Sequence, residues 1–136
     1  MQTFLSFLFV FILQSNVSPE IKLDTFDAIP SDIEGGCCYF YLSAKDKLEN
    51  KYICVNDFSD IAYLNINGKL ERFHLKRFDE KTNIYLYSNN DFEFTIKTNN
   101  SDPNNDDSSS VKGIITVYNK KHAKTMTKKI IGFCGD

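Results

Sequence analysis

The segment Phe92–Thr98 alternates apolar and polar residues without a break. Its apolar members are Phe92, Phe94 and Ile96, and they are separated by Glu93, Thr95 and Lys97. Successive side chains of a β-strand point to opposite faces of the sheet, so this pattern is typical of a strand with one face in a core and the other in water. We therefore expect an antiparallel sheet around this segment.

The same period of two recurs from Cys37 to the C-terminus, and no stretch there has a convincing helical period. Asn67-Gly68 is the clearest hairpin turn, because both residues tolerate positive φ. A bulge is expected near Glu71-Arg72, since Leu70 is out of phase with Phe73. The sequence predicts an all-β fold, an antiparallel meander of about eight strands closed as a small barrel or folded as a sandwich. The expected strands are 37–43, 51–55, 61–66, 69–76, 83–88, 92–98, 112–119 and 124–133.

The N-terminus carries an uncharged apolar run from Thr3 to Leu13. The run is shorter than the ~20 residues that span a bilayer. Its length fits the apolar part of a secretory signal, and a polar, small-residue patch follows it. We expect residues 1–15 to be a signal peptide cleaved after Ser15. The remaining chain would be a secreted or periplasmic protein with no membrane span.

Residues 16–36 form a predicted acidic arm before a β domain at 37–136. The arm has five acidic residues but one base, Lys22. We expect it to be a loop, either solvated or with Ile21 and Leu23 or Phe26 touching the domain. The whole chain has a net charge of −2, whereas nucleic-acid binding requires a strong basic excess. No nucleic-acid partner is therefore expected.

Four cysteines in an exported chain favour disulfides. Cys37 and Cys38 are adjacent in an expected strand, so their side chains point to opposite faces. We favour the pairs Cys38–Cys54 and Cys37–Cys134, and the exchanged pairs Cys37–Cys54 and Cys38–Cys134 remain open. A thiolate metal site with His74 or His122 is the alternative, but metal-binding spacings such as C-x-x-C are missing. We predict no metal and no cofactor.

No residue pattern indicates catalysis, and we do not expect an enzyme. His74 is in phase with Arg72 and Lys76, so it is expected to face solvent, and His122 lies in a basic turn. Several tyrosines fall opposite the aliphatic face of their strands and would suit protein or glycan contact, or packing on a second side of the sheet. With two lysines of the last turn, they form a candidate interaction surface: Tyr39, Tyr41, Tyr63, Tyr85, Tyr87, Lys120 and Lys121.

Three segments resemble a group of uncharacterised small exported proteins of Bacteroidetes-type bacteria. They are Glu34-Gly35-Gly36-Cys37-Cys38-Tyr39-Phe40, Ile66-Asn67-Gly68-Lys69 and Gly132-Phe133-Cys134-Gly135-Asp136. That group has Cys-x-Cys before the Tyr-Phe pair and Cys-Gly-Cys at the end. Here the first two cysteines are adjacent, and Asp136 stands where that group has its last cysteine. Cys54 would then take the place of that last cysteine as a disulfide partner. The resemblance implies export and no particular activity.

A looser resemblance is to periplasmic C-type lysozyme inhibitors, which are small exported β-barrels with a disulfide. It rests on Tyr52-x-Cys54, followed by a strand and Gly68. Their inhibitory Ser-Gly loop has no clear counterpart here. The first hypothesis is thus an exported, non-enzymatic module that binds a protein or a cell-envelope component. The alternatives are an inhibitor of a secreted hydrolase such as lysozyme, and a small-ligand carrier that uses the barrel interior.

Overall fold

The structure is a computed structural model that describes residues 20–33, 37–57, 60–99 and 110–135. The expected signal peptide at 1–15 lies outside the described residues, as does most of the polar segment between the strands at 92–99 and 110–119. In the described parts of the chain, no helix has the length and apolar character needed to cross a membrane.

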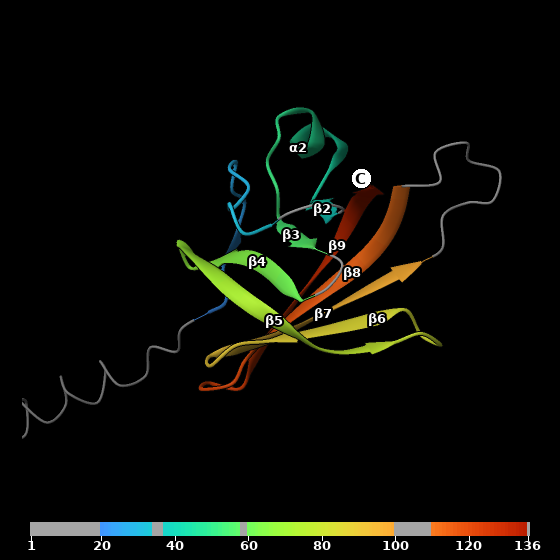
Figure 1. The fold of residues 1–136 in the computed structure, drawn as a ribbon. Coiled ribbons are helices and arrows are strands. Elements are labelled where there is room, and N and C mark those ends of the chain that lie inside the picture. Colours follow the sequence, from blue (N-terminus) through green and yellow to red (C-terminus); the bar gives the residue numbers. More distant parts are fainter. Residues whose placement is uncertain (1–19, 34–36, 58–59, 100–109, 136) are drawn as a thin grey trace, which may run out of the picture.

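Eight antiparallel strands form a closed barrel in which each strand pairs with its neighbours along the chain (Figure 1). The last strand, β9, pairs with the first strand of the barrel, β2, and the β4–β5 pairing completes the ring. The predicted meander is confirmed, and of the two closures left open the structure has the barrel. The barrel strands are β2 (Cys37–Tyr41), β3 (Cys54–Asp57), β4 (Ile61–Ile66), β5 (Lys69–Asp79), β6 (Ile84–Ser88), β7 (Phe92–Asn99), β8 (Ser110–Asn119) and β9 (Lys124–Gly135).

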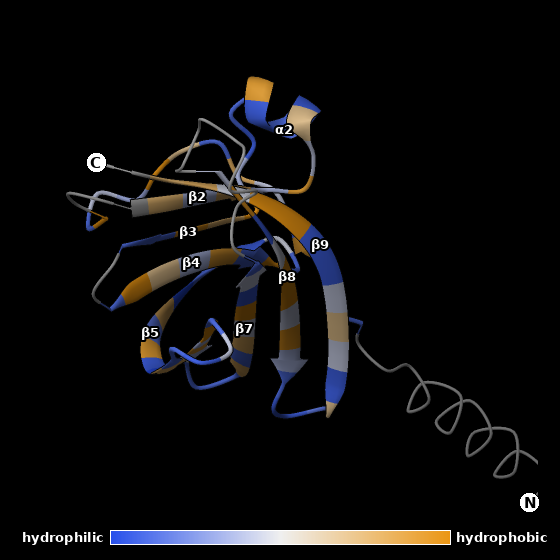
Figure 2. Ribbon diagram, turned by 90° about the vertical axis from the view of Figure 1, so that its right-hand side faces the viewer, coloured by the Kyte–Doolittle hydropathy of each residue, from blue (hydrophilic) through white to orange (hydrophobic). Residues whose placement is uncertain are grey.

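Large side chains fill much of the barrel interior. Phe94 is at the centre, with its ring 4.7 Å from that of Phe73 and 4.9 Å from that of Tyr87. The predicted inward residues of β7, Phe92, Phe94 and Ile96, are all buried. Along β8, whose hydropathy is coloured in Figure 2, the more exposed and the buried residues alternate from Lys112 to Asn119. The interior is thus a packed core over part of its length.

The hairpin between β4 and β5 has the predicted turn, because Asn67 and Gly68 have φ of 54° and 83°. The bulge, however, lies between Leu75 and Arg77 and not at Glu71-Arg72. The reason is that Leu70 does not enter the core: it is exposed, and the β4–β5 register runs without a break from Lys69 to His74.

The link between β2 and β3 differs from the prediction. Its charged residues form a short helix, α2 (Ala44–Leu48), which begins at Ser43, whose side chain accepts a hydrogen bond from Asp46 N at 3.1 Å. Strand β3 then begins at Cys54 and not at Lys51. Tyr52 pairs instead with Phe26 of the N-terminal arm, through backbone hydrogen bonds of 2.8 and 2.9 Å.

The described part of the acidic arm lies against the barrel. Its short strand β1 (Leu23–Asp24) pairs with β4. Ile21 and Leu23 pack against the interior cluster, and Phe26 packs against a second cluster on the outer side of the wall. The expectation of a loop is thus wrong for Leu23–Asp24, and of the alternatives left open for the arm the structure has contact with the domain, made by all three residues. The second cluster contains Phe26, Ile33, Tyr39, Tyr41, Tyr52, Val55, Ile131 and Phe133, and Lys47 of α2 lies 3.3 Å from the Phe133 ring centroid.

The barrel closure carries a disulfide between Cys38 of β2 and Cys134 of β9. Both favoured pairs, Cys38–Cys54 and Cys37–Cys134, are wrong, because the register places Cys54 opposite Phe40 and places Cys38 opposite Cys134, to which it is bonded. Cys54 is a buried free thiol. The Cys38–Cys134 half of the exchanged pairing is confirmed, and the side chain of Cys37 lies outside the described residues.

Candidate functional site

The predicted tyrosine surface is not present as a surface. Tyr41, Tyr63 and Tyr87 are 6%, 9% and 2% exposed, and Tyr39 and Tyr85 are half-buried. Tyr85 and Tyr87 point into the barrel, whereas Tyr39 and Tyr41 lie under the arm in the outer cluster. The sequence had left open whether these rings pack or bind, and the structure uses them for packing.

The two predicted lysines, Lys120 and Lys121, are exposed in the β8–β9 turn. Lys120 Nζ donates hydrogen bonds to Ser88 Oγ at 2.8 Å and to the Asn89 carbonyl at 2.6 Å. It therefore joins this turn to the β6–β7 turn. The backbone N–H of Lys121 donates a hydrogen bond to Asn119 Oδ1 at 3.0 Å.

A different group of residues forms the most distinctive outer surface. One row across three paired strands contains Lys97 of β7, Ile114 of β8 and Lys129 of β9. Lys112 is the next residue along β8 that lies on the same outer face. Ile114 is 41% exposed and the three lysines are exposed. We call Lys97, Lys112, Ile114 and Lys129 the basic face.

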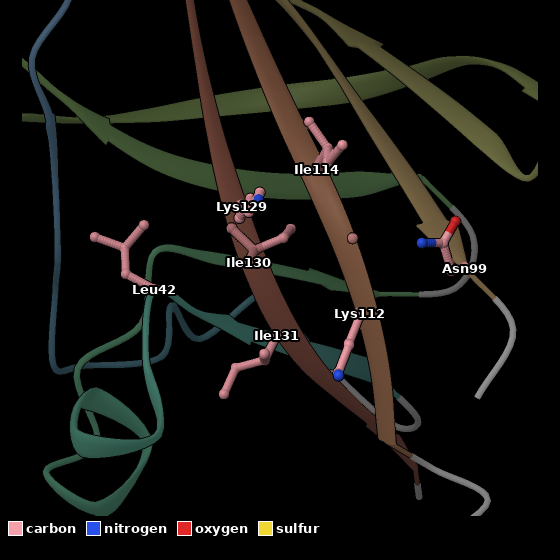
Figure 3. Close-up of a pocket in the computed structure, with 8 residues that line it drawn as sticks. Leu42, Asn99, Lys112, Ile114, Lys129, Ile130 and Ile131 are labelled. Carbon is pink, nitrogen blue, oxygen red and sulfur yellow. The ribbon is translucent and has the colours of Figure 1, made fainter. Parts of the chain in front are cut away.

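A hollow of about 300 Å³ lies on this surface (Figure 3). Figure 3 shows Leu42 beside β9 on one side and Asn99 of β7 on the other, with Lys112 and Ile114 between them. The hollow combines aliphatic side chains with ammonium groups. Its lining is Leu42, Asn99, Lys112, Gly113, Ile114, Lys129, Ile130 and Ile131.

The basic face is not neutralised by the described part of the protein. Other lysines have acidic neighbours: Lys51 lies 3.3 Å from Glu49, and Lys76 lies 3.2 Å from Glu93. Within residues 20–33, 37–57, 60–99 and 110–135, Lys97, Lys112 and Lys129 form no ion pair. Among the described residues, their positive charges are thus left without an acidic partner.

Strand β9 also has a free edge next to the basic face. Its pairing with β2 ends at Ile131 because the chain leaves the sheet after Tyr41 towards α2. From Lys124 to Ile130, β9 pairs with β8 alone among the described strands. In an antiparallel pair, alternate residues of such a strand direct their N–H and C=O groups outward, where another strand can bind them.

A polar network joins the arm to β4 and β5 on another part of the wall. The Tyr63 hydroxyl donates to the Asp32 carboxylate at 2.8 Å, and Arg72 Nε donates to it at 2.9 Å. These bonds, led by that from Tyr63, lower the pKa of Asp32. Burial and the Asp32 carboxylate raise the pKa of Tyr63. The network therefore holds the arm on the barrel.

His74 extends this network, and its exposure agrees with the prediction. Its Nδ1 lies 2.8 Å from Asp60 Oδ2, and its Nε2 lies 3.2 Å from Arg72 Nη1. Both ring nitrogens thus face charged groups of the network. Within the described residues, no serine or cysteine side chain hydrogen-bonds to His74. The arrangement is that of a surface ion-pair network, not of a nucleophile and its base.

Cys54 differs from a reactive cysteine in its surroundings. It is fully buried, and burial raises the pKa of its thiol. The thiolate is the form that attacks or binds a metal, so this thiol is a weak candidate for either.

Comparison with family models, curated proteins and solved structures gives no match to this chain.

Proposed function

We propose that the protein is an exported, non-enzymatic binding module whose basic face and β9 edge bind an extended acidic segment of a partner protein. The observation that carries this proposal is the row Lys97, Ile114 and Lys129, in which two lysines that form no ion pair with a described residue flank an exposed isoleucine. The Cys38–Cys134 disulfide supports export, because disulfides persist in oxidising compartments.

The geometry favours a partner segment in an extended conformation over the convex surface of a folded partner. A strand added to the edge of β9 would gain backbone hydrogen bonds, which supply affinity in β-augmentation. Its alternate side chains would then lie beside Thr127 and Lys129 on the outer face, and beside Met126 and Lys128 on the other. Acidic residues at these positions would meet lysines on both sides.

The same lysines would reject other strands. Lysines on an edge strand prevent indiscriminate pairing, because an apolar or basic strand would bring their charges together or bury them. An acidic strand removes that penalty. The lysines therefore protect the edge from apolar and basic strands, and they favour a partner of negative charge.

The test uses a short synthetic peptide that alternates glutamate with valine, and a control in which lysine replaces glutamate. We expect saturable binding of the acidic peptide, measured by fluorescence anisotropy, that weakens as salt screens the charges. The triple variant Lys97→Gln, Lys112→Gln, Lys129→Gln should bind it about tenfold more weakly, at roughly 0.5 kcal/mol for each exposed pair.

The matched control replaces three lysines that have acidic neighbours, as Lys51→Gln, Lys69→Gln and Lys76→Gln. It removes the same charge and should bind like the unchanged protein. A second peptide that is N-methylated at every residue tests the edge, because it has no backbone N–H to donate on either side and should bind more weakly. Equal binding of the acidic and basic peptides, or equal losses in the two triple variants, would overturn the proposal.

A further inference from the structure

A cavity of about 250 Å³ lies beside the disulfide, on the inner face of the strands whose outer face carries the basic face. We propose that this cavity binds a small, mostly apolar molecule that carries a neutral or cationic hydrogen-bonding group. The inference goes beyond the protein-binding proposal and does not depend on it. The cavity is lined by Cys38, Phe40, Asn56, Asp57, Tyr85, Ile96, Thr98, Val111 and Cys134.

The cavity is formed by the barrel itself. Its lining comes from β2, β3, β6, β7, β8 and β9, so strands from most of the ring converge on it. Below it the interior is closed by buried side chains such as Phe73, Phe94 and Val117. Pockets at the mouth of a β-barrel are a common place for small ligands. A ligand here would be held by strands and not by the connecting loops.

The walls are largely apolar. Phe40 and Ile96 are 2% and 1% exposed, and the disulfide and Val111 complete this side. The volume of the cavity sets an upper limit on the size of the ligand. A dry cavity of roughly 150 Å³ accepts one benzene molecule, whereas pockets for drug-sized ligands span ~300–1,000 Å³. The cavity therefore fits a single ring or a short chain with a polar substituent.

Asn56 provides a fixed polar group in the wall. It is 5% exposed, its Oδ1 accepts a bond from Cys38 N at 3.3 Å, and its Nδ2 donates to the Tyr87 hydroxyl at 2.8 Å. A side-chain amide has two N–H donors and two acceptor lone pairs, so one donor and one acceptor remain for a ligand. The two bonds hold the amide in place before the ligand arrives.

The charge of the lining determines which polar group fits. Asp57 is its one ionisable residue apart from Tyr85, and Asp57 Oδ1 accepts backbone bonds from Asp60 at 2.8 Å and Ile61 at 3.0 Å. None of the lining residues is Lys, Arg or His. An anionic ligand would therefore lose its hydration with no cationic lining residue to pair with, whereas a hydroxyl or amine group can hydrogen-bond to the Asn56 amide.

The test compares three ligands with one carbon skeleton: 2-phenylethylamine, 2-phenylethanol and phenylacetate. Binding to the oxidised protein is followed by calorimetry and by amide chemical shifts. We expect the amine and the alcohol to bind, with shifts at Phe40, Asn56 and Ile96. Phenylacetate should bind at least about tenfold more weakly than the amine, a difference of roughly 1.4 kcal/mol.

Two variants locate the site. Val111→Phe fills the cavity and should abolish binding, whereas Thr116→Phe adds the same ring to the outer face of β8 and should not. If Val111→Phe fails to fold, Thr98→Leu narrows the cavity from β7.

Three results would overturn the inference. They are no binding of the amine or the alcohol at millimolar concentration, tighter binding of phenylacetate, and unchanged binding in a folded cavity-filling variant. None of them bears on the acidic peptide, whose site lies on the outer wall, so failure of one proposal is distinct from failure of the other.

Discussion

Tyr87 and Asn56 form the polar contact in the core on which the surrounding packing depends. Tyr87 is 2% exposed, and burial raises the pKa of its phenol. Its hydroxyl receives the Asn56 amide proton inside an otherwise apolar cluster. A buried polar group that loses its partner retains the full cost of its desolvation. The pair thus fixes how β3 and β6 face each other across the barrel.

Tyr87→Phe should destabilise the protein by about 1–3 kcal/mol, because it leaves the Asn56 amide without this partner. Urea unfolding at neutral pH measures the change. Tyr85→Phe is the matched control, since Tyr85 lies on the same strand, is half-buried and makes no side-chain hydrogen bond within the described residues. Equal losses for the two variants would contradict the role given to the Asn56–Tyr87 bond.

Single residues also mark where prediction from sequence stops. In β6, Ile84 and Leu86 alternate with Tyr85 and Tyr87, and both sets can be buried. The pattern alone cannot say which set faces inward. The cysteine pairing was likewise undecidable, because a shift of one residue exchanges Cys37 with Cys38. The strand register decides both, and register depends on contacts between residues distant in sequence.

At the scale of elements, the strands with clear alternation or turns were well predicted. Strand β4 has the expected bounds, and β6, β7, β8 and β9 agree within two residues at each end. Strand β3 and helix α2 were not well predicted. Strand β3 begins later than expected because Tyr52 pairs with the arm. The arm itself has no regular pattern, so its position on the barrel could be guessed only from its few apolar residues.

The arm should detach from β4 and β5 at low pH. Since the folded pKa of Asp32 is lowered, its contacts contribute stability that is fully present above the unfolded pKa near 4 and is lost as the pH falls through the lower folded value. Amide signals of Phe26 and Ile33 report the docked arm. Asp32→Asn should weaken docking at neutral pH and remove most of this pH dependence.

Asp27→Asn provides the control for the arm, because Asp27 is exposed and takes part in none of the hydrogen bonds between the described residues of the arm and of the barrel. It removes the same charge from the arm. At every pH, the arm of this variant should be docked to the same extent as the arm of the unchanged protein. If both variants lose the pH dependence together, the general charge of the arm and not the Asp32 contact controls its docking.

The whole molecule is held closed at the β2–β9 seam. The Cys38–Cys134 bond joins residues 96 apart in sequence. Gly132 on the same seam lets the Phe40 ring lie against the backbone, since a Cβ there would be 2.6 Å from Phe40 Cδ1. The barrel thus closes by a covalent bond and a close aromatic contact. The sequence predicted the meander and a disulfide, but it did not distinguish barrel from sandwich.

Loss of the disulfide should reduce the free energy of unfolding by about 2–5 kcal/mol, because the reduced chain gains the entropy of a loop of roughly 100 residues. Urea unfolding with and without reductant measures it. The Cys134→Ala variant should show the lower stability at once and respond little to reductant. Cys54 should resist alkylation until the protein unfolds, since it is fully buried.

The most direct test of the account is an amide NMR titration of the oxidised protein with the glutamate–valine peptide. The account predicts shifts along the free edge of β9, from Lys124 to Ile130, and at Lys97 and Lys112 of the basic face. It also predicts slower amide exchange on that edge as new hydrogen bonds form. Shifts confined to the β4–β5 side of the barrel, or spread evenly over exposed lysines, would contradict it.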